Sequence, residues 1–380
     1  MNPKDLLNYF QKNTDAITDS IKEIVEIESP SYDVAQSKNV VNWIEKEISE
    51  ILPKAKIERI FKENYGEHLI IRAFNNSDKK PILLLGHTDT VHPVGTKEKT
   101  PTRIENGKLF GCGTFDMKAN IALMLHVFKA MKEFGLEPRQ PINVLLSCDE
   151  EIGSDTGREL VEQEAKKAAY CYVFEPSANG KVKTGRKGTG MYRVTAQGIP
   201  AHAGLEPEKG ISAILEISRQ VPRLHFLEDP DKGTTVNVCK IRGGTATNVI
   251  PEFSSCDVDV RFKTMDEAER VDKEIKQLKR LNVHVSLEIE GGINRPPLEK
   301  TGGINILLNL AQQKAKSFGY KIEETQVGGA SDGNFVGALG VPVLDGLGIA
   351  GDGAHTLEEF VYVEDIPKRA TLLTLLLSEE

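Results

Sequence analysis

The chain of 380 residues exceeds one ordinary hydrophobic core, so we expect two domains. Hydrophobic residues make up 39% and charged residues 27% of the sequence, which is typical of a soluble globular protein. The formal net charge of -8 argues against a nucleic-acid partner or an anionic membrane surface, because both require a basic surface.

The N-terminal sequence contains no basic segment followed by an apolar one, and no run of about 18 apolar residues occurs in the chain. We therefore expect a cytoplasmic protein without a membrane span. The five cysteines include no CxxC pair, and their odd number excludes complete internal pairing. Small buried thiols are the expected interpretation, although Cys112 and Cys148 lie beside acidic residues that are candidates for function.

Two amphipathic helices open the chain, because apolar residues recur at helical spacing over residues 4–28 and 37–52. The segment 82–85 is an aliphatic run typical of a strand buried on both faces of a parallel sheet between helices. The other elements predicted in this half are strands at 55–61, 68–74, 142–148 and 170–175, and helices at 117–135 and 156–168.

After Gly185 the strands alternate polar and apolar residues, as expected for a sheet with one covered face. The predicted order is strand 189–198, helix 210–226, strands 234–243 and 254–262, helix 265–281 and strand 283–290. This β-α-β-β-α-β order is ferredoxin-like. We therefore expect an α/β catalytic domain of residues 1–185 and 297–380, with a mixed, mostly parallel sheet between helices, and an inserted ferredoxin-like α+β domain of residues 186–296.

Polar side chains stand where the apolar strands of the first domain end and in a glycine-rich loop near the C-terminus. Ligands of open α/β sheets bind outside the carboxyl ends of the strands, so these side chains are candidates for chemistry. Imidazole and carboxylate groups without a thiolate suit zinc, cobalt or manganese, and this set suffices for two ions. The candidates are His87, Asp89, Asp116, Glu150, Glu151, Glu175 and His355.

An electrostatic argument favours a cation over the ordinary interpretation of each residue. Taken singly, Asp116 would be interpreted as a helix N-cap, Glu150 and Glu151 as an exposed acidic turn, and His355 as a loop histidine. Carboxylates a few ångströms apart, however, cannot all ionise without a compensating charge. Two divalent cations would remove that penalty.

Nine motifs in the chain resemble those of a known family. In chain order they are GHTDTV, GCGTFDMK, CDEEIGS, FEP, AHAG, GGTATNVIP, DVRF, GGASDG and GDGAH. They closely resemble the zinc-dependent metallopeptidase family of glutamate carboxypeptidase, aminoacylase, acetylornithine deacetylase and succinyl-diaminopimelate desuccinylase, nearest to glutamate carboxypeptidase. The resemblance runs from about residue 60 to 365 and implies a zinc-exopeptidase-like domain with two zinc ions per subunit, cobalt and manganese being alternatives.

The resemblance implies a role for each candidate of the first domain. Asp89 would orient the ring of His87, and Asp116 would bridge the ions, with a cis peptide bond on its carboxyl side. Glu150 would be the general base that takes a proton from water and passes it to the leaving amine. Because this segment is expected to be extended, Glu150 and Glu151 would point to opposite sides. The implied metal ligands are His87, Asp116, Glu151, Glu175 and His355.

The inserted domain would supply the remaining groups, again by resemblance. His202 would reach across the twofold axis of a homodimer into the other subunit's site and stabilise the oxyanion. Arg261 and Arg295 would bind a substrate carboxylate, assisted by Asn248. A surface ion pair is the ordinary interpretation of Arg261. The lower-ranked candidates for carboxylate binding are Arg186 and Lys187.

We expect a homodimeric di-zinc hydrolase that cleaves an amide bond next to a free carboxylate and releases a C-terminal amino acid, glutamate being favoured. An N-acyl-amino-acid deacylase of the aminoacylase or acetylornithine deacetylase type shares every catalytic residue and is the alternative. A dimer that binds metal without turnover is a remote alternative, because every expected position, including Glu150, is filled.

Overall fold

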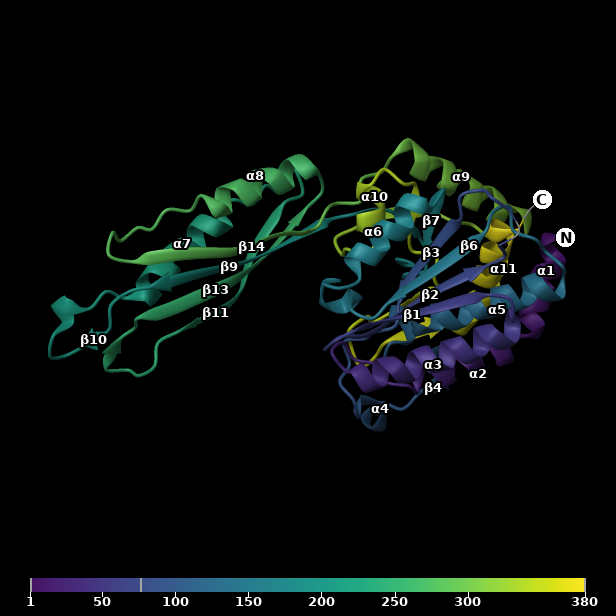
Figure 1. The fold of residues 1–380 in the computed structure, drawn as a ribbon, viewed down its shortest axis with the longest axis horizontal. Helices are drawn as coiled ribbons and strands as arrows, with labels where there is room; N and C mark the ends of the chain where they lie inside the picture. The colour runs from purple at the N-terminus through teal and green to yellow at the C-terminus, as the bar shows by residue number, and fades with distance from the viewer. Residues whose placement is uncertain (1, 76, 379–380) are drawn as a thin grey trace. The chain divides into compact units, whose positions relative to one another are not determined.

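The computed structural model describes residues 2–75 and 77–378, which form two compact units (Figure 1). The first unit comprises the residues up to Gly185, Lys300–Val327 and the residues from Ser331 on. The second comprises Arg186–Glu299 and Gly328–Ala330. Among the described residues, the helices are all too short or too polar to cross a membrane.

The first unit is built on a six-stranded mixed sheet. Its strands, in spatial order, are β1 (Lys56–Lys62), β2 (Gly66–Ala73), β6 (Ile142–Ser147), β3 (Ile82–His87), β7 (Tyr170–Val173) and β16 (Val343–Leu344). The last four run parallel to one another, whereas β1 and β2 are antiparallel to their neighbours. The prediction of a mixed, mostly parallel sheet is confirmed.

Helices cover both faces of this sheet (Figure 1). The larger layer contains α1 (Pro3–Lys12), α2 (Thr14–Val25), α3 (Val34–Ile51), α5 (Ala119–Glu133), α9 (Gly302–Ser317) and α11 (Ile366–Leu377). The smaller layer contains α6 (Arg158–Lys167) and α10 (Gly333–Ala338). A single turn, α4 (Thr96–Lys99), follows the end of β3.

The prediction of one helix over residues 4–28 is wrong, because the chain forms α1 and α2 instead. Asn13 separates them with φ -100° and ψ 9°, and its side-chain amide donates to the carbonyl oxygen of Tyr9 over 2.8 Å. A short polar side chain that binds nearby backbone competes with the helical hydrogen bonds. The apolar spacing carried no sign of this interruption.

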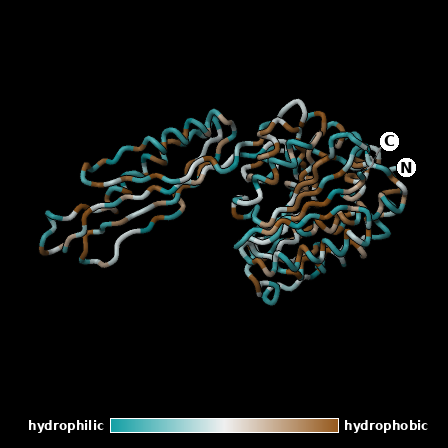
Figure 2. The backbone as a smooth tube through the Cα atoms, in the orientation of Figure 1, coloured by the Kyte–Doolittle hydropathy of each residue, from teal (hydrophilic) through white to brown (hydrophobic). Residues whose placement is uncertain are grey.

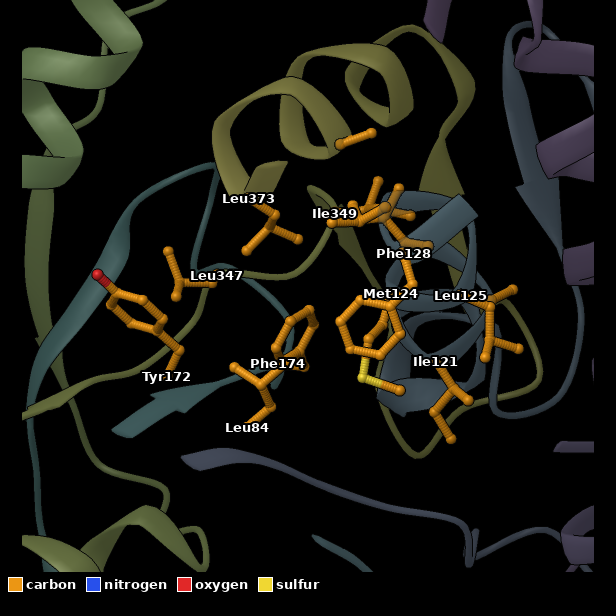
Figure 3. Packing of buried hydrophobic residues seen from close by; sticks show 14 of the residues in the cluster. Leu84, Ile121, Met124, Leu125, Phe128, Tyr172, Phe174, Leu347, Ile349 and Leu373 are labelled. Atoms are coloured by element: carbon orange, nitrogen blue, oxygen red, sulfur yellow. The ribbon is translucent and has the colours of Figure 1, made fainter. Parts of the chain in front are cut away.

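The core explains why β3 is apolar throughout. Alternate residues of a strand face opposite sides of the sheet, and here both sides are covered. Leu84 contributes to the cluster under α5, where Met124 and Phe128 also pack, and Phe174 lies in the same cluster (Figure 3). Leu83 points to the other layer and is equally buried. The hydropathy colouring shows the hydrophobic strands running through the centre of this unit (Figure 2).

A second, smaller sheet of the first unit was not predicted. Its strands, in spatial order, are β17 (Gly351–Asp352), β18 (Phe360–Tyr362), β5 (Lys108–Phe110) and β4 (Arg103–Glu105). All three pairings are antiparallel. The sheet places the glycine-rich loop of His355 beside the segment that leads to Asp116. A further pair is β8 (Val182–Arg186) with β15 (Glu324–Val327).

The second unit has the predicted ferredoxin-like order. Its elements, in chain order, are β9 (Gly188–Gln197), α7 (Ala213–His225), β11 (Thr235–Gly243), β13 (Phe253–Phe262), α8 (Met265–Lys276) and β14 (Ser286–Arg295). The four strands form an antiparallel sheet in the order β11-β13-β9-β14, and both helices pack against it. A short pair, β10 (Ala201–His202) and β12 (Val249–Ile250), lies outside this sheet.

Glu164 ties α6 to the main sheet. Its carboxylate accepts two hydrogen bonds from Arg72 of β2 (2.8 and 3.0 Å) and one from Asn143 of β6 (3.0 Å). Lys167 adds a bond of 2.6 Å from the next turn of α6. Burial alone would raise the pKa of Glu164, but the hydrogen bonds from Arg72 and Lys167 lower it to about 2.

Replacing Glu164 by Gln should remove a stabilising term that depends on pH. The folded pKa of about 2 lies below the ordinary 4.5, so ionised Glu164 stabilises the fold above pH 4.5 and this contribution disappears as pH falls toward 2. With an allowance for screening by solvent, Glu164→Gln should lower the free energy of unfolding by about 2 kcal/mol at pH 7. The difference from the wild type should shrink toward pH 3.

Urea unfolding followed by circular dichroism at both pH values measures this difference. The exposed Glu159 of the same helix provides the control, since Glu159→Gln should change the free energy of unfolding by less than about 0.5 kcal/mol at either pH. A Glu164→Gln difference that stays constant between the two pH values contradicts the assignment.

Candidate active site

All five sequence-predicted metal ligands lie together at the carboxyl ends of the parallel strands. They come from separate segments: the end of β3, the turn Thr114–Lys118, the turn after β6, the residue pair after β7 and the loop before β18. Two groups of ligand atoms form, each with all its atoms within 4.8 Å of one another, and Asp116 belongs to both. The groups are His87, Asp116 and Glu175, and Asp116, Glu151 and His355.

The two oxygens of Asp116 face different groups. Its Oδ1 lies 3.1 Å from Nε2 of His87, and that nitrogen is 3.4 Å from Oε1 of Glu175. Its Oδ2 lies 3.5 Å from Nε2 of His355, which is 3.0 Å from Oε2 of Glu151. One carboxylate therefore stands between two sets of ligands, as a bridge between two ions requires.

Asp89 contacts several groups besides the imidazole of His87. The backbone oxygen of Asp89 lies 3.0 Å from Nδ1 of His87, and its carboxylate lies 3.4 Å from the same nitrogen. The carboxylate also accepts the backbone N–H groups of Glu150 (3.2 Å) and Glu151 (3.1 Å) and the hydroxyl of Ser31 (2.7 Å). Asp89 thus contacts both His87 and the acidic turn that follows β6, and its role in orienting His87 stays a prediction.

Close approach of Met117 explains the glycine that precedes His87. A Cβ atom on Gly86 would meet Cε of Met117 at 2.4 Å, so a larger residue there would require the Met117 side chain to move. The Sδ atom of Met117 then lies 3.3 Å from the backbone nitrogen of His87. The peptide bond between Asp116 and Met117 is cis, as the family resemblance implied.

The expectation of an extended segment at Glu150 and Glu151 is wrong, because Glu150–Ile152 is a 3₁₀ turn. Successive side chains of such a turn still diverge, by about 120°. Two acidic residues for which no role was predicted, Asp149 and Asp332, support the turn. Asp149 accepts the N–H and hydroxyl of Thr156 (2.7 and 2.8 Å), and Asp332 accepts the hydroxyl groups of Ser147 and Ser154.

Charge crowding at this site shifts several pKa values. Burial alone would lower the pKa of His87, but hydrogen bonds to Asp116, Asp89 and Glu175 raise it well above its ordinary value. Hydrogen bonds to Asp116 and Glu151 raise the pKa of His355 to about 10. Burial raises the pKa of Glu151 to about 7, and the charge of Asp116 adds to this.

These shifts and one buried atom test whether the residues fit a metal ion. In the absence of a cation the cluster retains protons, because carboxylates in close proximity cannot all ionise. Oε1 of Glu151 is buried and has no hydrogen-bond partner within the described residues. Nitrogen and oxygen donors with such an oxygen match the preferences of zinc and related divalent ions. The residues fit.

The second unit contains the other sequence-predicted residues, and their roles stay predictions. His202 is exposed, and its Nδ1 accepts the N–H groups of Gly204 and Leu205 (both 3.1 Å). Arg261 is half-buried and makes two hydrogen bonds of 2.8 Å to Asp259. The remaining residues are the exposed Asn248, the buried Arg295 and Arg186, and the half-buried Lys187.

A mixed sheet with a cluster of imidazole and carboxylate groups at the ends of its parallel strands is the arrangement expected of a metallohydrolase. The chain belongs to the Peptidase family M20/M25/M40, whose family model matches residues 83–379. It is therefore a metal-binding peptidase or deacylase.

Two curated relatives extend this similarity. Carboxypeptidase G2 of Pseudomonas sp. (strain RS-16) is 30% identical over 384 aligned positions, which cover 97% of this chain and 91% of that protein. Succinyl-diaminopimelate desuccinylase of Verminephrobacter eiseniae (strain EF01-2) is 32% identical over 76% of this chain and 75% of its own length.

Solved structures share the fold at low identity. A tripeptidase from Staphylococcus aureus subsp. aureus Mu50 superposes with a TM-score of 0.76 at 20% identity, covering 96% of this chain and 98% of that chain. An M20 family metallo-carboxypeptidase from Sulfolobus solfataricus gives 0.73 at 16% identity, covering 94% and 98%. These similarities bear on the fold alone.

Removal of the Asp116 carboxylate should abolish metal binding by both candidate ligand groups, because one of its oxygens faces each group. We expect Asp116→Ala to retain almost no zinc after dialysis, whereas Glu175→Ala should keep the ion of the other group. Elemental analysis by mass spectrometry gives the number of ions per chain. The exposed Asp352, which ends β17 three residues before His355, is the control, and Asp352→Ala should match the wild type. Equal zinc content in Asp116→Ala and Asp352→Ala contradicts the bridge.

Proposed function

We propose that the enzyme is a two-zinc carboxypeptidase that releases a C-terminal amino acid, with glutamate favoured, from a peptide or an N-acyl amino acid. The observation that carries the two-ion part is the position of Asp116, whose Oδ1 and Oδ2 each face a separate ligand group. Similarity to carboxypeptidase G2 over 97% of the chain supports the carboxypeptidase part.

His87, Asp116 and Glu175 would hold one ion, and Asp116, Glu151 and His355 the other. Bound zinc polarises a substrate carbonyl and lowers the pKa of bound water toward neutrality. Glu150 precedes Glu151 in the same turn and is 8% exposed, so its carboxylate would work in a largely desolvated environment. We assign to it the transfer of a proton from the attacking water to the leaving amine.

Recognition of the substrate is assigned to the second unit. A free carboxylate needs a cationic partner with two parallel donors, and guanidinium groups provide this geometry. Asp259 occupies the donors of Arg261 over 2.8 Å, so a substrate carboxylate would exchange with that of Asp259. Arg295 and Asn248 would complete the contact. Within a homodimer, His202 would stabilise the oxyanion of the partner's site.

An N-acyl-amino-acid deacylase is the second candidate function. Several curated relatives are succinyl-diaminopimelate desuccinylases, and three of these are 29–32% identical to this chain. The proposed catalytic residues serve this reaction equally well, because both substrates carry an amide next to a free carboxylate. Location in the cytoplasm stays a prediction from the sequence.

Substitution of the proposed base separates catalysis from metal binding. Glu150→Gln should retain two zinc ions per chain, and its kcat should fall by about 10²–10⁴-fold, because the amide cannot accept the proton of water. Hydrolysis of folyl-glutamate measures kcat, and elemental analysis measures zinc. Glu159→Gln, at the exposed start of α6, is the control with wild-type activity.

Activity of Glu150→Gln within tenfold of the wild type contradicts the assignment of the base. The same assay with N-acetyl and N-succinyl amino acids and dipeptides distinguishes the two candidate functions. The carboxypeptidase proposal expects the highest kcat/KM for a substrate with C-terminal glutamate. Preference for an acylated basic amino acid would replace it with the deacylase.

A further inference from the structure

We propose that Glu359, together with His92, positions the bridging carboxylate of Asp116 and thereby sets the affinity of the site for both ions. Neither residue is a metal ligand, so each acts through Asp116 as a positioning residue. This inference rests on the two-ion site of the proposed function. Its evidence is the set of hydrogen bonds that converge on one buried carboxylate.

Glu359 is 1% exposed and lies immediately before β18. Its Oε1 accepts the backbone N–H groups of Phe115 and Asp116, each over 2.8 Å. Its Oε2 accepts the N–H of Gly113 over 2.8 Å and lies 3.0 Å from Nε2 of His92. Four donors therefore surround a carboxylate that would be very costly to bury without them.

These donors come from the loops that carry the ligands. Glu359 follows His355 by four residues, and His92 follows His87 by five. The backbone N–H of Asp116 itself is one of the donors. Hence three ligand-bearing loops, distant in sequence, meet on the side chain of Glu359.

A contact with Thr90 also restricts the Asp116 loop. Gly113 has a φ of 73°, and a Cβ atom there would meet Cγ2 of Thr90 at 2.5 Å. The loop therefore lies against Thr90 and is also hydrogen-bonded to Glu359 through three amides. With the backbone of Asp116 fixed in this way, only its few side-chain torsions remain to be set before the carboxylate reaches the position of a metal ligand. Preorganised ligands bind a metal more tightly than ligands that must first be ordered.

A titration with Co²⁺ alone, added to the metal-free full-length protein, tests this role without an assay of turnover. Glu359→Leu keeps the side-chain size and removes both acceptors, so it should weaken Co²⁺ binding at both positions by about 10–100-fold. Glu359→Gln keeps one oxygen for the amides of Phe115 and Asp116 and should fall between Glu359→Leu and the wild type. Isothermal calorimetry and the visible absorption of Co²⁺ report affinity and ligand geometry.

Glu164 supplies matched controls, because it is also a buried carboxylate with several hydrogen bonds but serves α6. Glu164→Leu and Glu164→Gln should lower the thermal midpoint and leave Co²⁺ affinity within about twofold of the wild type. Wild-type affinity in Glu359→Leu would overturn the proposal. So would an equal loss of affinity in Glu164→Leu, since it would show a general effect of destabilisation.

Hydrogen exchange in the metal-free protein gives a second readout that depends on no ion. The amide of Gly113, whose acceptor Oε2 becomes an NH2 group, should exchange about tenfold faster in Glu359→Gln than in the wild type or Glu164→Gln. The amides of Phe115 and Asp116 keep a neutral acceptor and should exchange faster by a smaller factor. This comparison decides the matter if Glu359→Leu does not fold, and unchanged exchange would overturn the proposal. Fewer than two Co²⁺ ions on the wild type contradict the proposed two-ion function, whereas the exchange rates report on Glu359 alone.

Discussion

The crowding of three carboxylates and two imidazoles at the ends of the parallel strands constrains the whole of the first unit. Asp116, Glu151 and Glu175 repel one another, and burial strengthens that repulsion because the surroundings screen it poorly. Protons on His87 and His355 relieve part of it when no cation is present. Such a cluster keeps its geometry only where several hydrogen bonds hold the surrounding backbone in place.

The surrounding backbone meets that requirement through carboxylates that accept amide hydrogen bonds. Asp89 accepts the N–H groups of the acidic turn, and Glu359 accepts those of the Asp116 loop. Each joins segments far apart in the chain, so the positions of the ligands depend on tertiary contacts rather than on local geometry. The sheet supplies a rigid base, because β3 is buried on both faces.

The sequence predicts the parts of this arrangement that have local signals. An unbroken aliphatic run ending at Gly86 identified β3 and placed His87 at its end, and family motifs supplied the other ligands. The 3₁₀ turn at Glu150 was missed because Asp89, 61 residues earlier, fixes it. Glu359 was missed because its partners lie more than 240 residues away, and one glutamate in an acidic loop resembles a solvated residue.

Anomalous diffraction from crystals grown with zinc, recorded at the zinc absorption edge, tests the central claim of a two-ion site bridged by Asp116. The account predicts two peaks per chain, both within bonding distance of Asp116. One peak should contact His87 and Glu175, and the other Glu151 and His355. A single peak, or two peaks of which either lies away from Asp116, would contradict it.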